Sequence, residues 1–135
     1  MNRVQSSELA AFSRKFRFAG GRLRRLRLKT QGDGISLEVV LAARPAMANL
    51  GAQAKPIRIR LRMVGLEEYR FQKRLGMPAG RVTDVRFGYY NGVFFVNFDA
   101  WGLPPGESPG IHDYRASEVY AAGRDLYWEE VKKAV

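Results

Sequence analysis

The sequence has no cysteine and a single histidine, His112. Without cysteine, the chain cannot form disulfides, zinc–thiolate sites or a cysteine nucleophile. It also lacks any apolar run of about 18 residues, and its polar, basic N-terminus does not resemble a signal peptide, so we expect a cytoplasmic protein that makes no membrane contact. It contains no phosphate-binding glycine loop, nucleophile elbow or zinc-protease motif. We therefore expect a non-catalytic protein with no metal or other cofactor.

Acidic residues are scarce in the first two thirds of the chain. Residues 1–86 contain 19 Lys and Arg against 6 Asp and Glu, whereas residues 87–135 contain 4 against 7, and the net charge is +10. A field of this kind attracts acidic proteins and nucleic acids without specifying either. The excess of arginine over lysine has a second explanation, a compositional bias of the source genome.

Aromatic residues are plentiful, with eight Phe, six Tyr and two Trp. Together with the length, they predict a single folded domain over residues 1–135, large enough to bury a core without disulfides or a metal ion to stabilise it. Near the N-terminus, Ser6 or Ser7 is a candidate helix cap, and Leu9, Phe12 and Phe16 follow at helical spacing. We expect a short helix there.

Two hairpins are predicted from favoured turn sequences. A turn at Asp33-Gly34 pairs Thr30 with Leu37, Leu28 with Val39, Leu26 with Leu41 and Lys29 with Glu38, which separates apolar from charged residues. A turn at Asn91-Gly92 pairs Tyr89 with Phe94, Phe87 with Val96, Val85 with Phe98, Gly88 with Phe95, Arg86 with Asn97 and Asp84 with Asp99. In this register most aromatics point into the core, with Phe95 and Tyr90 as the main exceptions.

The segment 57–65, IRIRLRMVG, alternates strictly and predicts a strand. After Gly65, LEEYRFQKRL predicts a further strand with Tyr69 and Phe71 inward, or else a short helix. The last segment, residues 117–133, is read as a helix, and a hairpin turning at Gly123-Arg124 is the alternative. Taken together, these elements predict an α+β fold. Its single twisted antiparallel sheet has about six strands, mostly as a meander and in a form that could approach a barrel, with short N-terminal and C-terminal helices.

The alternation in 57–65 places Arg58, Arg60 and Arg62 on one face of the sheet, about 6.5–7 Å apart. Arg27 and Lys29 extend that face if the first hairpin lies beside it. The pattern has three interpretations: a solvated sheet face, a surface for an acidic protein, or a surface for nucleic acid. The third is the weakest, because single-strand binders add exposed aromatics to such a face. We take an acidic protein as the leading partner class and nucleic acid as the alternative.

A second candidate site is the Pro- and Gly-rich segment 102–118. It brings His112, Asp113 and Tyr114 together in sequence, and Asp84 opposite Asp99 supplies two carboxylates that repel each other unless a proton or cation intervenes. A small-ligand or enzyme site here is the last of our three hypotheses. The simpler interpretation is a loop histidine and two solvated carboxylates.

The order of FRFAGGRLRRLRLKTQGDGISLEVVL, PIRIRLRMVGLEEYRF and the Asn-Gly hairpin resembles the strand pattern of small β-rich bacterial single-domain proteins. These include one group of immunity proteins from polymorphic toxin systems. The resemblance covers roughly residues 16–99 and carries no diagnostic motif. It implies a non-enzymatic, partner-binding role.

Overall fold

The computed structural model describes residues 1–17, 23–32, 34–45, 57–71, 85–98, 114–115 and 119–131. The described strands are β1 (Asn2–Arg3), β2 (Phe16–Arg17), β3 (Leu23–Gln31), β4 (Gly34–Pro45), β5 (Ile57–Phe71), β6 (Arg86–Tyr90), β7 (Val93–Asn97) and β8 (Val119–Val131). A 3-10 turn, Ser6–Glu8, leads into helix α1, Leu9–Lys15.

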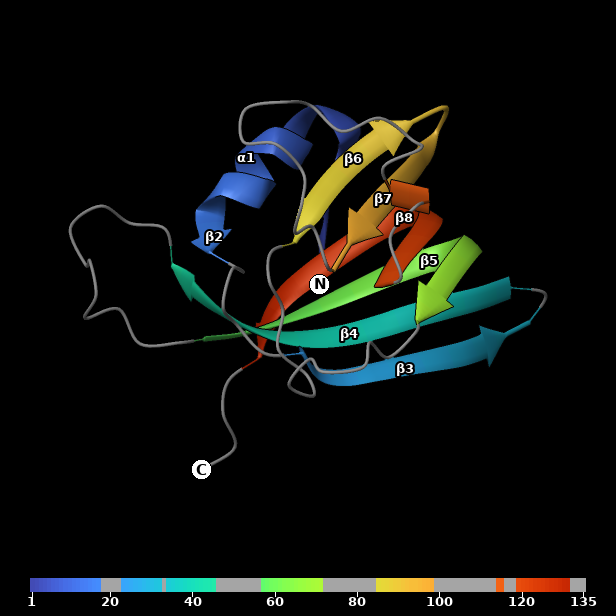
Figure 1. Cartoon of the computed structure of the whole chain (residues 1–135), viewed down its shortest axis with the longest axis horizontal. Helices are drawn as coiled ribbons and strands as arrows, with labels where there is room; N and C mark the ends of the chain where they lie inside the picture. Colours follow the sequence, from blue (N-terminus) through green and yellow to red (C-terminus); the bar gives the residue numbers. More distant parts are fainter. Residues whose placement is uncertain are drawn as a thin grey trace.

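All eight strands belong to one antiparallel sheet that stays open, with the order β2-β4-β5-β8-β7-β6 (Figure 1). β3 pairs with β4, and β1 pairs with β8. The α+β fold with an antiparallel sheet is thus confirmed. The sheet has more strands than the six expected, and the described residues contain one complete α-helix, α1, rather than two. The sheet is not a simple meander, because β8 lies between β5 and β7.

The predicted C-terminal helix and the alternative hairpin are both wrong. Residues 119–131 form one continuous strand that hydrogen-bonds with β5 along one side and with β7 and β1 along the other. Gly123 lies inside this strand, where a Cβ atom would collide with the side chain of Met63. The glycine is required for close packing rather than for a turn, and local periodicity could not reveal that the tail has strands on both sides.

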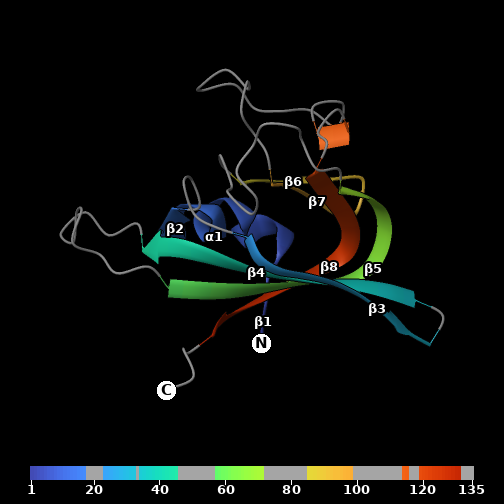
Figure 2. The same ribbon diagram turned by 60° about the horizontal axis from the view of Figure 1, so that its bottom comes forward.

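The predicted break after Gly65 is also wrong, since β5 runs on to Phe71. Gly65 has a φ of +68°, and the register with β8 shifts between Leu66 and Glu68, which is the signature of a β-bulge. Figure 2 shows β5 and β8 curving upward, away from β3 and β4, toward β6 and β7. Tyr69 follows this bend and is 49% exposed rather than inward, whereas Phe71 packs against the core.

The hairpin at Asn91-Gly92 has the predicted register, from Arg86 opposite Asn97 to Tyr90 opposite Val93, with positive φ at both turn residues. The first hairpin is shifted by two residues, so that Leu28 faces Leu37 and Arg27 faces Glu38. The pairing ends with Gln31 opposite Gly34, and Gly32, directly after β3, has a φ of +56°. A shift of two leaves every side chain on its predicted face, because strand side chains alternate with a period of two.

The main core fills the concave side of the curved sheet. It includes Leu37, Val39, Ile59, Leu61 and Leu126, all at most 3% exposed. Helix α1 covers one end of this core with Leu9 and Phe12, and the ring of Phe12 lies 5.3 Å from that of Phe87 and 5.5 Å from that of Trp128. The helix is confirmed, but Ser6 and Ser7 lie in the 3-10 turn and neither hydroxyl caps it, and Phe16 is already in β2.

A second, smaller core lies on the opposite, outer face of β7 and β8. It consists of Phe95, Tyr114, Tyr120 and Ala122, with Tyr90 and Val93 at its edge. Phe95 points away from the main core as expected, yet it is only 3% exposed, because Tyr114 packs over it. This part of the outer face is therefore covered, whereas the part formed by β3, β4 and β5 is charged.

Candidate functional site: a basic sheet face around Glu38

The register of three neighbouring strands brings the predicted basic residues together. Glu38 on β4 lies directly opposite Arg27 on β3 and Arg62 on β5, and the alternation along β5 adds Arg60 and Arg58. The same alternation along β3 adds Lys29 and Arg25. We call the six cations Arg25, Arg27, Lys29, Arg58, Arg60 and Arg62 the basic face.

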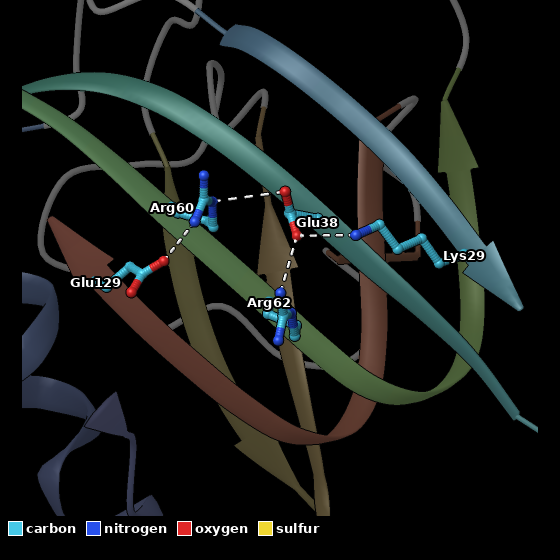
Figure 3. A network of polar contacts seen from close by, with 5 residues as sticks. All are labelled: Lys29, Glu38, Arg60, Arg62 and Glu129. Carbon is cyan, nitrogen blue, oxygen red and sulfur yellow. Dashed lines mark hydrogen bonds and ion pairs between the residues drawn. The ribbon is translucent and has the colours of Figure 1, made fainter. Parts of the chain in front are cut away.

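Glu38 is the acidic centre of this face (Figure 3). Its carboxylate accepts a hydrogen bond of 3.1 Å from Arg62, and it forms ion pairs with Arg60 at 3.5 Å and Lys29 at 3.6 Å. The residue is only 6% exposed, because it lies in a middle strand beneath the cationic side chains. One buried carboxylate thus holds three cations, which fixes the direction of two guanidinium groups.

Burial by itself raises the pKa of Glu38, since it disfavours the charged form. The hydrogen bond from Arg62 and the positive charges of Lys29, Arg60 and Arg62 outweigh that effect, so the pKa lies below its ordinary value. Glu38 is consequently ionised at neutral pH and is a poor general base. Its role in this geometry is that of a counter-ion that positions the arginines.

A second acid on this face, Glu129, was missed at the level of sequence. It lies directly opposite Arg60 in the β5–β8 ladder and accepts a hydrogen bond from the Arg60 guanidinium. Glu129 could not be placed beside the arginine row while residues 117–133 were read as a helix or a hairpin. Alternation of Asp125, Tyr127 and Glu129 with Leu126 and Trp128 was the available signal.

The surplus of positive charge is therefore smaller than the sequence suggested, but it remains. Arg25, Arg27 and Arg58 form no ion pair with any residue of the described ranges; Arg25 and Arg27 are exposed, and Arg58 is half-buried. Asp125, the other acid on the outer side of β8, is bound by Arg3 at 2.8 Å. The two ends of the basic face thus carry cations that no described acid neutralises.

The other predicted site can be placed only in part. Asp84, Asp99, His112 and Asp113 lie outside the described residues. Tyr114 is described and is 1% exposed, with its ring 5.7 Å from Phe95 and 5.9 Å from Tyr90. It also lies against Gly88, where a Cβ atom would come within 2.8 Å of the tyrosine hydroxyl. In this position Tyr114 acts as a packing residue of the second core.

A separate polar cluster borders that second core. Arg115 donates two hydrogen bonds, of 3.0 and 2.8 Å, to the carboxylate of Glu68, which also accepts one of 3.1 Å from the Tyr120 hydroxyl. The hydrogen bonds from Arg115 are the largest effect on Glu68, and they lower its pKa. The pKa of Tyr120 is raised, mainly by burial and secondly by the hydrogen bond to Glu68. Both acids of the cluster are thus held in one protonation state at neutral pH, as expected of a structural contact.

Each of the two clusters consists of acids paired with basic or hydroxyl side chains. Within the described ranges, no three His, Asp or Glu side chains converge as ligands of a metal ion. A cavity inside the main core is lined only by apolar side chains, which offer no polar group to orient a substrate. The arrangement of the basic face is instead suited to bind carboxylates, because free guanidinium groups bind them in a bidentate manner.

Comparison with protein-family models, with curated protein sequences and with solved structures found no match. The resemblance to small bacterial β-rich proteins and immunity proteins accordingly stays a prediction from strand pattern. Over the described residues, the structure contains no helix with the length and apolar character needed to cross a membrane.

Proposed function

We propose that the protein is a non-catalytic binding domain of the bacterial cytoplasm whose basic face docks an acidic protein. One observation carries the proposal. Arg27 and Arg58 carry charges that no described acid neutralises, on either side of a Glu38 carboxylate already shared among three cations. Charge of this kind favours and steers association with an acidic surface.

The rigidity of the basic face supports the same conclusion. Arg60 and Arg62 are held by Glu38 and Glu129. Their side chains are therefore ordered before a partner binds, and binding loses less conformational entropy. Ordered guanidinium groups then present a fixed pattern of donors to carboxylates. An immunity-like role, in which the partner is a toxin, is one form of this proposal and rests on the strand-pattern resemblance.

Nucleic acid is the second partner class, and the distribution of aromatic side chains disfavours it. Tyr127 lies beside Arg62 on the outer side of β8 and is half-buried. The most exposed tyrosines among the described residues, Tyr69 and Tyr89, lie on the concave side of the sheet instead, directly opposite the core residues Ala121 and Phe94. The basic face therefore offers little for base stacking, which supplies much of the affinity of single-strand binders.

A charge-reversal experiment tests the proposal. The variant Arg27→Glu/Arg58→Glu replaces two positive charges by two negative ones, which lowers the net charge by four, and it leaves the residues of the Glu38 ion pairs unchanged. The control Arg14→Glu/Arg124→Glu makes the same change in net charge at two exposed arginines outside the basic face. We expect an acidic protein to co-purify from the native host at about 150 mM salt with wild type and control but not with the test variant.

Two outcomes would overturn the proposal. One is co-purification of the same protein with both double variants, since the basic face would then not be the contact. The other is retention of labelled single- or double-stranded oligonucleotides by wild type, lost in the test variant and falling steeply with salt, which would assign the face to nucleic acid.

A further inference from the structure

β3 is a free edge of the sheet. It pairs with β4 along one side, and no described element hydrogen-bonds with its other side. Figure 1 shows no further strand or helix beyond β3 at this border of the sheet. The strand is nine residues long, so alternate residues direct backbone N–H and C=O groups outward over almost its whole length.

The side chains of this edge alternate between two chemistries. Arg25, Arg27 and Lys29 belong to the basic face, while Leu26 and Leu28 belong to the concave side. Leu28 is 41% exposed, although it lies on the side where the core is formed. Ile35, on the neighbouring end of β4, is 39% exposed on the same side. A strand added beside β3 would bury more of this apolar surface.

The charges decide what such a strand must contain. A second copy of the chain, pairing β3 against β3, would bring Arg25, Arg27 and Lys29 opposite an identical set of cations. Like charges directly opposite each other destabilise a strand pair, and charge on edge strands commonly prevents self-association in this way. The same cations attract an acidic strand, so the edge is closed to a second copy and open to a segment of opposite charge.

We propose that the acidic partner inserts an extended segment beside β3, as an additional strand of the sheet. This inference rests on the proposed function and specifies its binding mode. The segment alternates acidic residues, which face Arg25, Arg27 and Lys29, with apolar residues, which cover Leu26 and Leu28. Main-chain hydrogen bonds supply affinity in this mode of recognition, and the alternating side chains supply specificity.

The test uses the full chain and the acetylated, amidated peptide EVEVEVE. We expect saturable binding by calorimetry, together with slowed hydrogen exchange at alternate amides of β3 in NMR spectra. Arg27→Glu should weaken this peptide by about fivefold or more, because one attractive cross-strand position becomes repulsive. Arg58→Glu, two strands further into the sheet, should change affinity for EVEVEVE less than twofold.

The control peptide EEEEVVV has the same composition without the alternation. Equal affinity for this peptide, or binding of EVEVEVE without protection of any β3 amide, would overturn strand addition and indicate charge attraction alone. The proposed function is judged separately, by the native partner. If the native partner no longer binds Arg27→Glu/Arg58→Glu but does not protect the β3 amides of the wild-type protein, only the binding mode is wrong. Protection of the β3 amides by the native partner supports both proposals.

Discussion

Glu38 on β4 accepts a hydrogen bond of 3.1 Å from Arg62, its direct neighbour across the β4–β5 ladder. The contact joins a buried acid to a partly exposed base, and Arg60 and Lys29 complete the arrangement. The concave side of the sheet is apolar, whereas the charged side chains of the outer face are arranged around a single carboxylate. The order of that face therefore depends on this one residue.

Replacement of Glu38 by Gln should lower the free energy of unfolding by about 1.5–3 kcal/mol, the range for a lost hydrogen bond to a charged group. Arg60 and Arg62 would then repel each other without a counter-charge between them. Urea denaturation monitored by circular dichroism measures the change. The matched control is Glu67→Gln, which breaks the exposed pair with Arg124 and should alter stability by less than about 0.5 kcal/mol. Equal losses in the two variants would contradict the central role of Glu38.

The stability should also fall in acid. The folded-state pKa values of Glu38 and Glu68 are lowered from an ordinary value of 4.5, so the folded state binds fewer protons than the unfolded chain. Their contribution is complete above about pH 4.5 and is lost as the pH falls through the lowered pKa values. Urea midpoints recorded from pH 7 to pH 3 test this expectation, and Glu38→Gln should flatten the decline. A wild-type midpoint that is constant down to pH 3 would contradict it.

Gly123→Ala should destabilise the protein by about 1–3 kcal/mol, as overpacking of a core does. The new methyl group would meet the Met63 side chain and the backbone oxygen of Val64. A double-mutant cycle with Met63→Ala isolates the collision: the cost of Gly123→Ala should shrink when Met63 is already truncated. An undiminished cost would show that the Met63 contact is not its cause.

Tyr114→Ala should cost about 3–5 kcal/mol, because Tyr114 is among the largest fully buried side chains and its removal empties the second core. Tyr89→Ala provides the comparison, since Tyr89 is 41% exposed and one of its faces already meets water. We expect the exposed tyrosine to cost less than half as much in the same denaturation assay. The reverse order would place Tyr114 in a role other than packing.

The second hairpin shows how far local pattern reaches. Asn91 and Gly92 adopt the positive φ angles that their turn requires, and the alternation of aromatic residues then leaves one register. In the first hairpin the described pairs are shifted by two residues from the register that a turn at Asp33-Gly34 predicts, and no side chain moves to the other face. Periodicity determines faces, but it does not distinguish registers that differ by two.

The candidate site, like the hairpins, could be predicted from sequence only where alternation and local pairing are sufficient. Alternation placed Arg58, Arg60 and Arg62 on one face, and the first hairpin placed Lys29 near Glu38, an ion pair that the structure contains at 3.6 Å even though the two residues are diagonal neighbours. Glu129 was not accessible, since its position depends on residues 119–131 forming a strand between β5 and β7.

By itself, then, the sequence determined the class of fold, the alternating strands, the register of the second hairpin from Arg86 to Asn97 and the side of the sheet on which the arginines lie. These features follow from interactions within about 15 residues, where turn geometry and the period of two are sufficient. Tertiary structure decided the strand over residues 119–131, the β-bulge at Gly65, the close packing at Gly123, and which cations of the basic face, Arg25, Arg27 and Arg58, have no acid in the described residues. Those outcomes depend on which distant strand lies alongside, and hydrogen bonds to two neighbours outweigh the weak local preference of residues 117–133 for a helix.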